Sequence, residues 1–340
     1  MEAGRGVIRE GGLTAGAQQD EARSFAPSAR LASSALPPIL WRGMRLLYVT
    51  TTAIGLLASS LAVAQGGATG PDIFLVGIRT NGPAIEFTGA VKNATARPGY
   101  DDQPSWSPDG QSVYYTSTRA DAQADIYRLD VVTGTSTRIT MTAPESEYSA
   151  TVLADGTSIS VIRVERDSAQ RLWRFPLDGG APSVMLPALK PTGYQAWATP
   201  STVAIFVLGS PNALAFADIV TNKVDTVTRN IGRSLHRIPG TTRISFSQKI
   251  SETESWIQEF DPASGTITRR APLPVGVEDY AWTPGGALVA GDGSKVVTWN
   301  NGAWQTVGDL GPQGIGGITR LAVSPDGTWI ALVGVPAAGR

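Results

Sequence analysis

The tetrapeptide Ser-Pro-Asp-Gly stands at residues 107–110 and again at 324–327, near the end of the 340-residue chain. Its proline presets the φ angle of a tight turn, and its glycine adopts the positive φ that such a turn requires. Alternating runs rich in Tyr, Trp, Val and Thr flank the first copy and are typical of β-strands. One antiparallel sheet cannot bury both of its faces, so the repetition predicts that several such sheets stack on one another.

Six copies of this unit can be traced along the chain. In each copy an inner strand ends at the turn and a second strand follows, and in the first five copies a polar and aromatic third strand and a Thr-rich fourth strand come next. The copies recur about every 41 to 46 residues, which is the spacing of β-propeller blades. The inner strands end at residues 105–110, 151–156, 196–201, 237–240, 281–286 and 322–327. The segment 237–240 is the weakest match.

The sixth copy stops after its second strand, at residues 332–334. Residues 72–76 resemble a third strand, and residues 84–87 can follow them as a fourth strand after a turn at 80–82. We therefore predict an all-β fold over residues 70–340, a six-bladed β-propeller of four-stranded antiparallel blades. Its last blade is closed by the N-terminal strands, two strands from each end of the chain, which removes the open edge of the ring.

Composition agrees with this fold and excludes several classes of function. Charged residues make up 17% of the chain, and no long helical period occurs in its body. The formal net charge of −1 gives no electrostatic basis for binding nucleic acid. The chain has no cysteine, which excludes disulfides, thiolate metal sites and a cysteine nucleophile.

Residues 44–64 have the pattern of a secretory signal peptide. Met44 and Arg45 precede an apolar run that ends in Ala-Val-Ala at 62–64, an A-x-A cleavage signal. The alternative is a single membrane anchor, but the threonines and serines within the run make it a weak span. Residues 1–43 have no strand or helix period, so we expect a disordered leader or a misassigned start. The prediction is a periplasmic or secreted protein that is not inserted in the membrane after cleavage.

The unit at residues 104–110, followed by Thr-Ser-Thr-Arg at 116–119 and Asp-Ile-Tyr at 125–127, resembles the WD40-like PD40 repeat of TolB-type propellers. The resemblance covers residues 70–340 and implies a six-bladed periplasmic propeller; TolB itself is a soluble envelope component that binds protein partners. The α/β domain that precedes the TolB propeller is not expected here, because few residues separate the predicted cleavage site from the first strand. The repeat also occurs in peptidases of the prolyl oligopeptidase type, but no G-x-S-x-G sequence follows.

In a propeller, the residues just before the inner strands surround one mouth of the central channel. We predict that a ligand binds at this mouth. The predicted ligand-binding residues are Asp101, Asp102, Gln103, Glu147, Tyr148, Tyr194, His236, Glu278, Asp279 and Arg320. This mixture of carboxylates, tyrosines, one arginine and the only histidine suits a small ligand, a peptide terminus or a cation. The alternative is that these are ordinary solvated loop residues.

Calcium or magnesium is the cofactor that such a mouth could hold. The carboxylates of Asp101, Asp102, Glu147, Glu278 and Asp279 would supply oxygen ligands, whereas one histidine and no cysteine do not suit zinc. Arg320 in the same ring would repel a cation, so our expectation is no cofactor, and the metal stays unassigned. We assign no catalytic residue, because His236 has no identifiable nucleophile beside it and is expected to be structural.

Two hypotheses about function follow. The first is an exported, monomeric, non-catalytic propeller that binds a protein or peptide of the cell envelope through the channel mouth. The second is a propeller hydrolase, lactonase or lyase with a divalent cation at that mouth, which requires the carboxylates to converge. A structural or regulatory protein without a pocket would leave little trace in the sequence.

Overall fold

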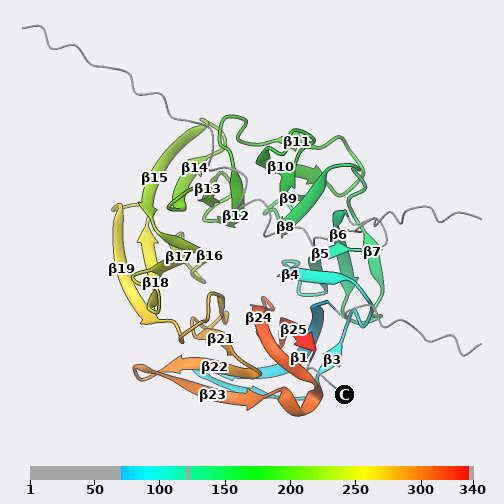
Figure 1. Ribbon diagram of the computed structural model, residues 1–340, viewed down its shortest axis with the longest axis vertical. Coiled ribbons are helices and arrows are strands. Elements are labelled where there is room, and N and C mark those ends of the chain that lie inside the picture. Colours follow the sequence, from blue (N-terminus) through cyan, green and yellow to red (C-terminus); the bar gives the residue numbers. More distant parts are fainter. Residues whose placement is uncertain (1–69, 120–122, 337–340) are drawn as a thin grey trace, which may run out of the picture. The chain divides into compact units, whose positions relative to one another are not determined.

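The computed structural model describes residues 70–119 and 123–336, which form six antiparallel sheets arranged as the blades of a β-propeller (Figure 1). The predicted all-β, six-bladed architecture is confirmed. The predicted leader at 1–43 and signal peptide at 44–64 lie outside the described residues. Within the described ranges, no helix has the length and apolar character needed to cross a membrane.

Each blade orders its strands from the centre outward as they follow one another in the chain, except in the last blade. We number the blades 1 to 6 in chain order. The inner strands are β4 (Tyr100–Trp106), β8 (Ser146–Val152), β12 (Thr192–Trp197), β16 (Ile231–Arg237), β20 (Tyr280–Trp282) and β24 (Ile315–Val323). The second strands are β5 (Ser112–Thr118), β9 (Ser158–Val164), β13 (Thr202–Val207), β17 (Ile244–Lys249), β21 (Leu288–Asp292) and β25 (Trp329–Pro336).

The third strands are β6 (Ala124–Asp130), β10 (Gln170–Pro176), β14 (Ala213–Asp218), β18 (Ser255–Asp261), β22 (Lys295–Asn300) and β1 (Asp72–Asn81). The outer strands are β7 (Ser136–Arg138), β11 (Ser183–Val184), β15 (Lys223–Arg229), β19 (Thr266–Pro272), β23 (Ala303–Asp309) and β2 (Ala84–Phe87). A short 3-10 helix, η2 (Gly311–Gln313), precedes β24.

Blade 6 is closed as predicted, by β24 and β25 from one end of the chain and β1 and β2 from the other. β1 pairs with β25 from Asp72 opposite Gly334 to Gly77 opposite Trp329. The structure adds one feature to the prediction, because β3 (Lys92–Asn93) also pairs with β1. β2 pairs with the last residues of β1 and β3 with Phe74 and Leu75, so together they form one interrupted outer strand.

The predicted turns have the expected geometry. Gly110 and Gly327 have φ angles of 70° and 72°, a region that glycine enters without a steric cost. The Ser107 hydroxyl donates to Asp109, and its oxygen accepts a hydrogen bond from the Ser112 backbone N–H at 2.9 Å. These contacts fix where the inner strand ends and the second strand begins.

The blades are held together by apolar side chains between their faces. Tyr114 and Ile126 of blade 1, for example, pack against Ile159 and Val161 of blade 2, and all four are buried. Between blades 6 and 1, Leu75 packs in another buried cluster with Val113 and Tyr115 of blade 1. Burial of about 25 cal/mol per Å² of apolar surface makes these interfaces the main stabilising contribution to the ring. The stacked sheets fix the inner strands around a common centre.

Candidate functional site

β-Bulges interrupt the inner strands at the predicted channel mouth. The pairing with the second strand shifts between Asp102 and Ser105 in β4 and between Tyr148 and Thr151 in β8, and β12, β16 and β24 are also irregular near their starts. Gln103 and Ser149, at the two named bulges, have φ angles of 59° and 55°. Positive φ is sparsely populated by residues other than glycine, and bulges re-aim side chains next to binding sites.

A cavity of about 370 Å³ lies between the inner strands, and residues of all six blades line it. The lining includes Gln103, Tyr194, His236, Asp279 and Arg320, which are five of the ten predicted site residues. A sixth, Asp102, contacts this lining through Arg320. The central channel therefore holds a cavity with both polar and apolar lining at the predicted position.

Arg320 crosses this cavity. Its Nε lies 3.1 Å from Asp102 Oδ1 in blade 1, and its Nη2 donates to the Tyr194 hydroxyl at 3.0 Å in blade 3, opposite its own blade 6. Its Nη1 lies 4.0 Å from Asp279 Oδ1 in blade 5. Burial alone would lower the pKa of the guanidinium, but the two carboxylates outweigh it and raise that pKa, so Arg320 stays charged. One buried cation thus joins four blades.

Asp279, Ser234 and His236 form a second hydrogen-bonded group in the same cavity. The Ser234 hydroxyl donates to Asp279 Oδ1 at 3.0 Å and lies 2.9 Å from His236 Nε2. Burial raises the pKa of Asp279 to about 6, although Arg320 opposes the shift, and burial lowers the pKa of His236 to about 4. Serine therefore stands between the acid and the histidine, whereas in a catalytic triad the histidine stands between serine and acid.

Further polar contacts join the inner strands of neighbouring blades. Gln103 Oε1 accepts from the Ser149 backbone N–H at 2.7 Å, and Gln195 Nε2 donates to Ser149 O at 3.0 Å. Asp279 Oδ2 accepts from the Leu321 backbone N–H at 3.0 Å. With the contacts of Arg320 and Ser234 these form a polar ring around the channel. Among the described residues, the ring lacks a contact only between β12 and β16.

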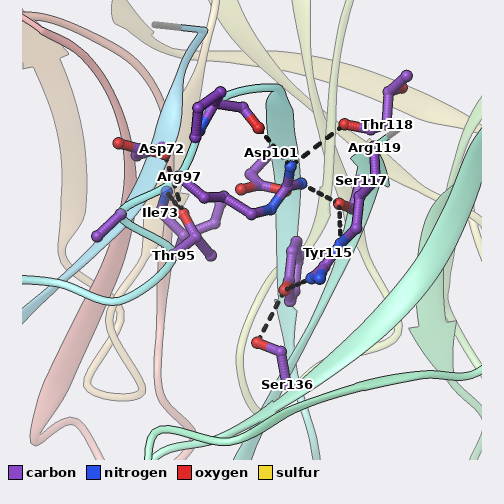
Figure 2. Close-up of polar contacts among 12 residues, drawn as sticks. Asp72, Ile73, Thr95, Arg97, Asp101, Tyr115, Ser117, Thr118, Arg119 and Ser136 are labelled. Carbon is purple, nitrogen blue, oxygen red and sulfur yellow. Dashed lines mark hydrogen bonds and ion pairs between the residues drawn. The ribbon is translucent and has the colours of Figure 1, made fainter. Parts of the chain in front are cut away.

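Four predicted residues do not point into the cavity. Asp101 is fully buried and binds Arg97, whose guanidinium lies between Asp101 and Ser117 (Figure 2). Glu147 is fully buried beside Arg163, 3.3 Å from its Nε, and accepts from Thr142. Burial raises the pKa of both carboxyls. Both therefore make contacts within their own blades rather than face a ligand.

Tyr148 and Glu278 complete the set outside the cavity. Tyr148 packs against the apolar cluster between blades 2 and 3. Glu278 lies at the rim, where Lys249 Nζ at 3.1 Å and Arg233 Nε at 3.2 Å pair with it. Successive side chains of a strand point to opposite faces, which explains why Asp102 of β4 reaches Arg320 in the channel while the neighbouring Asp101 does not.

The five carboxylates proposed as metal ligands consequently do not converge. Asp101, Glu147 and Glu278 each pair with an arginine, and Asp102 and Asp279 share Arg320. Within residues 70–119 and 123–336, no three acidic or histidine side chains group closely enough to hold a metal ion. The donor set does not suit calcium or magnesium, because arginine occupies the place that the cation would take.

Two charged residues of the cavity lining were not identified from the sequence. Arg233 and Arg237 of β16 both line the channel cavity, and both are exposed. Arg233 lies outside the aligned positions of the repeat, whereas Arg237 begins the aligned segment 237–240. One sequence feature could have identified Arg237. It stands at the repeat position where the other copies have tryptophan or valine, in the copy that matches the repeat least well.

No protein-family model matches the chain, and no curated protein matches it. The fold and channel define its class, a six-bladed β-propeller closed by strands from both ends. Among solved structures, the chain is similar to a putative TolB from Agrobacterium tumefaciens, with TM-score 0.61 and 16% identity over 79% of this chain and 99% of that one. It is also similar to TolB from Acinetobacter baumannii, with TM-score 0.53 and 15% identity over 78% of this chain and 64% of that one.

A gluconolactonase from Xanthomonas campestris is similar as well, with TM-score 0.56 and 13% identity over 79% of this chain and 97% of that one. The predicted likeness to TolB-type propellers is confirmed at the level of the fold. Because a binding protein and an enzyme can share a propeller, the fold alone does not choose a function.

Proposed function

We propose that this protein is an exported propeller that binds a peptide segment of an envelope protein in its central channel and catalyses no reaction. The observation that carries the proposal is the pairing of the channel's reactive groups with one another. Arg320 is held by Asp102 and Tyr194, and Asp279 by Ser234 and Leu321. These contacts stabilise a preformed cavity, which is what a binding site requires.

The geometry disfavours the enzymatic alternative. A metal-dependent hydrolase, lactonase or lyase needs converging carboxylates, and here each is paired with an arginine. A serine hydrolase needs a hydroxyl activated by histidine, but the Ser234 hydroxyl donates to Asp279 at 3.0 Å. A hydroxyl that donates to a carboxylate cannot at the same time give its proton to the histidine.

Three observations support an envelope peptide as the ligand. The cavity of about 370 Å³ is large enough for a few residues, and its polar lining can bind a peptide backbone. The signal-peptide pattern at 44–64 supports export. The similarity to TolB structures supports a binding propeller of the envelope.

The experiment is an affinity capture from envelope extract of the source organism with the full chain as bait. Arg233→Gln alters the mouth at a side chain that is 47% exposed, so the fold should be kept. Arg229→Gln, on the exposed outer strand β15, is the matched control. We expect one envelope protein to be captured by the wild type and by Arg229→Gln, and at least several-fold less by Arg233→Gln. Equal capture by all three proteins, or none by the wild type, would refute the proposal.

A further inference from the structure

One position of the repeat, the last residue of each inner strand, joins neighbouring blades. The residues there are Trp106, Val152, Trp197, Arg237, Trp282 and Val323. Every indole donates to the preceding blade: Trp106 Nε1 to Ala322 O at 3.0 Å, Trp197 Nε1 to Ser160 Oγ at 2.9 Å, and Trp282 Nε1 to Ser245 Oγ at 2.8 Å. Blade 4 alone has a charged residue at this position.

Both partners of the indole bond are absent between blades 3 and 4. Arg237 replaces the tryptophan, and its Nε donates to Thr241 O in the turn of its own blade at 2.6 Å. On blade 3, the buried Ala204 pairs with Ala196 in the place that Ser160 and Ser245 occupy in blades 2 and 4. The polar ring is interrupted at the same boundary. Within the described residues, the boundary between blades 3 and 4 therefore lacks both the indole hydrogen bond and the polar-ring contact. Each of the other five boundaries has at least one of the two.

A cavity of about 440 Å³ lies beside this boundary, lined by residues of blades 2, 3 and 4, and we call it the blade 3–4 pocket. Most of its lining is apolar, contributed by Val152, Leu153, Ala154, Ala196, Trp197, Pro200 and Leu235. Arg237 is the one lining residue, among those described, that is charged at neutral pH, because burial keeps the pKa of His236 near 4. The pocket thus combines apolar walls with a single cation.

We propose that the blade 3–4 pocket binds the C-terminal carboxylate of a peptide that ends in an apolar residue. The proposal rests on the proposed function and names the ligand's chemistry. None of the ion pairs in the described part of the chain involves Arg237, so its guanidinium is available to pair with a carboxylate. The apolar walls bury the terminal side chain.

The blade 3–4 pocket is continuous with the channel cavity. The two share the lining residues Thr151, Gln195, Leu235, His236 and Arg237. A peptide whose terminus occupies the pocket therefore extends along the polar channel. A free aliphatic acid also combines a carboxylate with an apolar chain, but it has no peptide backbone to lie in the channel. The test must therefore distinguish a peptide from a free aliphatic acid.

Calorimetric titration of the full chain with N-acetyl-Leu-Phe, its C-terminal amide and octanoate tests the proposal. We expect the free-carboxylate peptide to bind and the amide to bind at least tenfold more weakly, because the amide cannot pair with Arg237. Absence of saturable binding, or equal binding of acid and amide, would overturn the proposal. Octanoate binding as tightly as the peptide would overturn the assignment to a peptide.

Two variants and a control assign the binding to Arg237. Arg237→Trp introduces the residue that blades 1, 3 and 5 have at this position and should fill the pocket, abolishing binding while the melting temperature stays equal or rises. Arg237→Gln keeps the pocket open and should weaken binding about tenfold, which keeps the test informative if the tryptophan variant does not fold. Arg229→Gln should bind as the wild type does. Undiminished binding by Arg237→Gln would overturn the proposal.

The same variants separate this inference from the proposed function. If Arg237→Gln still captures the envelope protein and Arg233→Gln does not, the mouth binds the partner and the blade 3–4 pocket assignment is wrong. If the wild type captures nothing, the proposed function itself fails.

Discussion

At the scale of single residues, the channel is organised by one buried cation. Arg320 has a side chain only 12% exposed, and Asp102 and Asp279, its carboxylate partners, are each 13% exposed. A buried ion pair adds little stability over an apolar substitute, but removing one partner leaves an uncompensated buried charge. Its role is therefore to fix the geometry of the channel across blades.

Replacement of Arg320 by methionine should lower the free energy of unfolding by about 3 to 5 kcal/mol, because Asp102 and Asp279 would lose their counter-ion. Denaturant titration measures the change. Arg79→Met is the control, since Arg79 and its partner Glu86 are each 73% exposed and 3.6 Å apart. An exposed pair of this kind contributes less than about 1 kcal/mol. Similar losses in the two variants would show that Arg320 is not a structural cation.

Asp279 and His236 contribute to the pH dependence of stability with opposite signs. The pKa of Asp279 is raised from 3.8 to about 6, so between these values the folded state retains a proton that the unfolded chain releases, and this contribution falls as pH rises. The pKa of His236 is lowered from 6.5 to about 4, so the unfolded chain binds the extra proton and this contribution rises with pH. In the wild type the two slopes oppose each other.

Asp279→Asn should therefore expose the rising contribution of His236. Between pH 4 and 6, the unfolding free energy of this variant should increase relative to the wild type by at most about 1.4 kcal/mol per pH unit. His236→Gln should show the reverse slope. Urea titrations at several pH values check both variants, and profiles parallel to that of the wild type would contradict the two shifted pKa values.

Several of the residues that line the channel could be predicted from the sequence, but their contacts with one another could not. Asp102, Gln103, Tyr194, His236, Asp279 and Arg320 were predicted and lie in or beside the cavity. Asp101 and Glu147 were placed there wrongly, because β-bulges and the two-residue period of the strand decide the facing side. Arg97, in the loop before β4, contacts both Asp101 and Ser117 of β5 (Figure 2), and the contact with Ser117, 20 residues away, cannot be seen in a local pattern.

At the scale of elements, the closing strand β1 decides whether the ring is complete. Its side chains lie on both faces of blade 6: Leu75 packs toward blade 1 and Val76 toward blade 5. The sequence predicted this closure because the missing strands of the last copy were present before the first. It did not predict β3, since two residues carry no strand period.

Leu75→Ala should destabilise the propeller by about 2 to 5 kcal/mol, because Leu75 is 2% exposed and a cavity would remain. Unfolding should remain a single transition, since β1 links the first and last parts of the ring. Ile267→Ala on the outer strand β19 is the control and should cost much less, because Ile267 is 38% exposed. A separate early transition in Leu75→Ala would indicate that blade 6 unfolds independently.

At the scale of the whole molecule, the fold is common to both functional hypotheses, and the contacts within the channel are what support the proposal of binding. The six blades could be predicted from the sequence repeat, because turn residues and the two-residue period of strands are local signals. The choice between binding and catalysis depends on which charged side chains pair with each other across blades. These pairs join residues far apart in the chain, so the sequence alone left both hypotheses open.

Removal of divalent cations should leave the thermal stability of the protein unchanged. Addition of calcium or of excess chelator should shift the melting temperature by less than about 1 °C, because a ligand stabilises only a protein that binds it. Thermal unfolding of the full chain measures this. A chelator-sensitive shift of several degrees would return the metal-dependent enzyme to consideration.

Site-specific photo-crosslinking in the source organism tests the proposed binding at the channel most directly. A photoreactive residue at Thr319, which lines a separate cavity of about 300 Å³ beside Glu278 and Arg320, reports on a ligand at the mouth. One at Ile267 on β19 reports on the outer surface. A discrete adduct with one envelope protein from position 319 alone is the expected result. No adduct from position 319, or the same adduct from both positions, would contradict binding at the channel mouth.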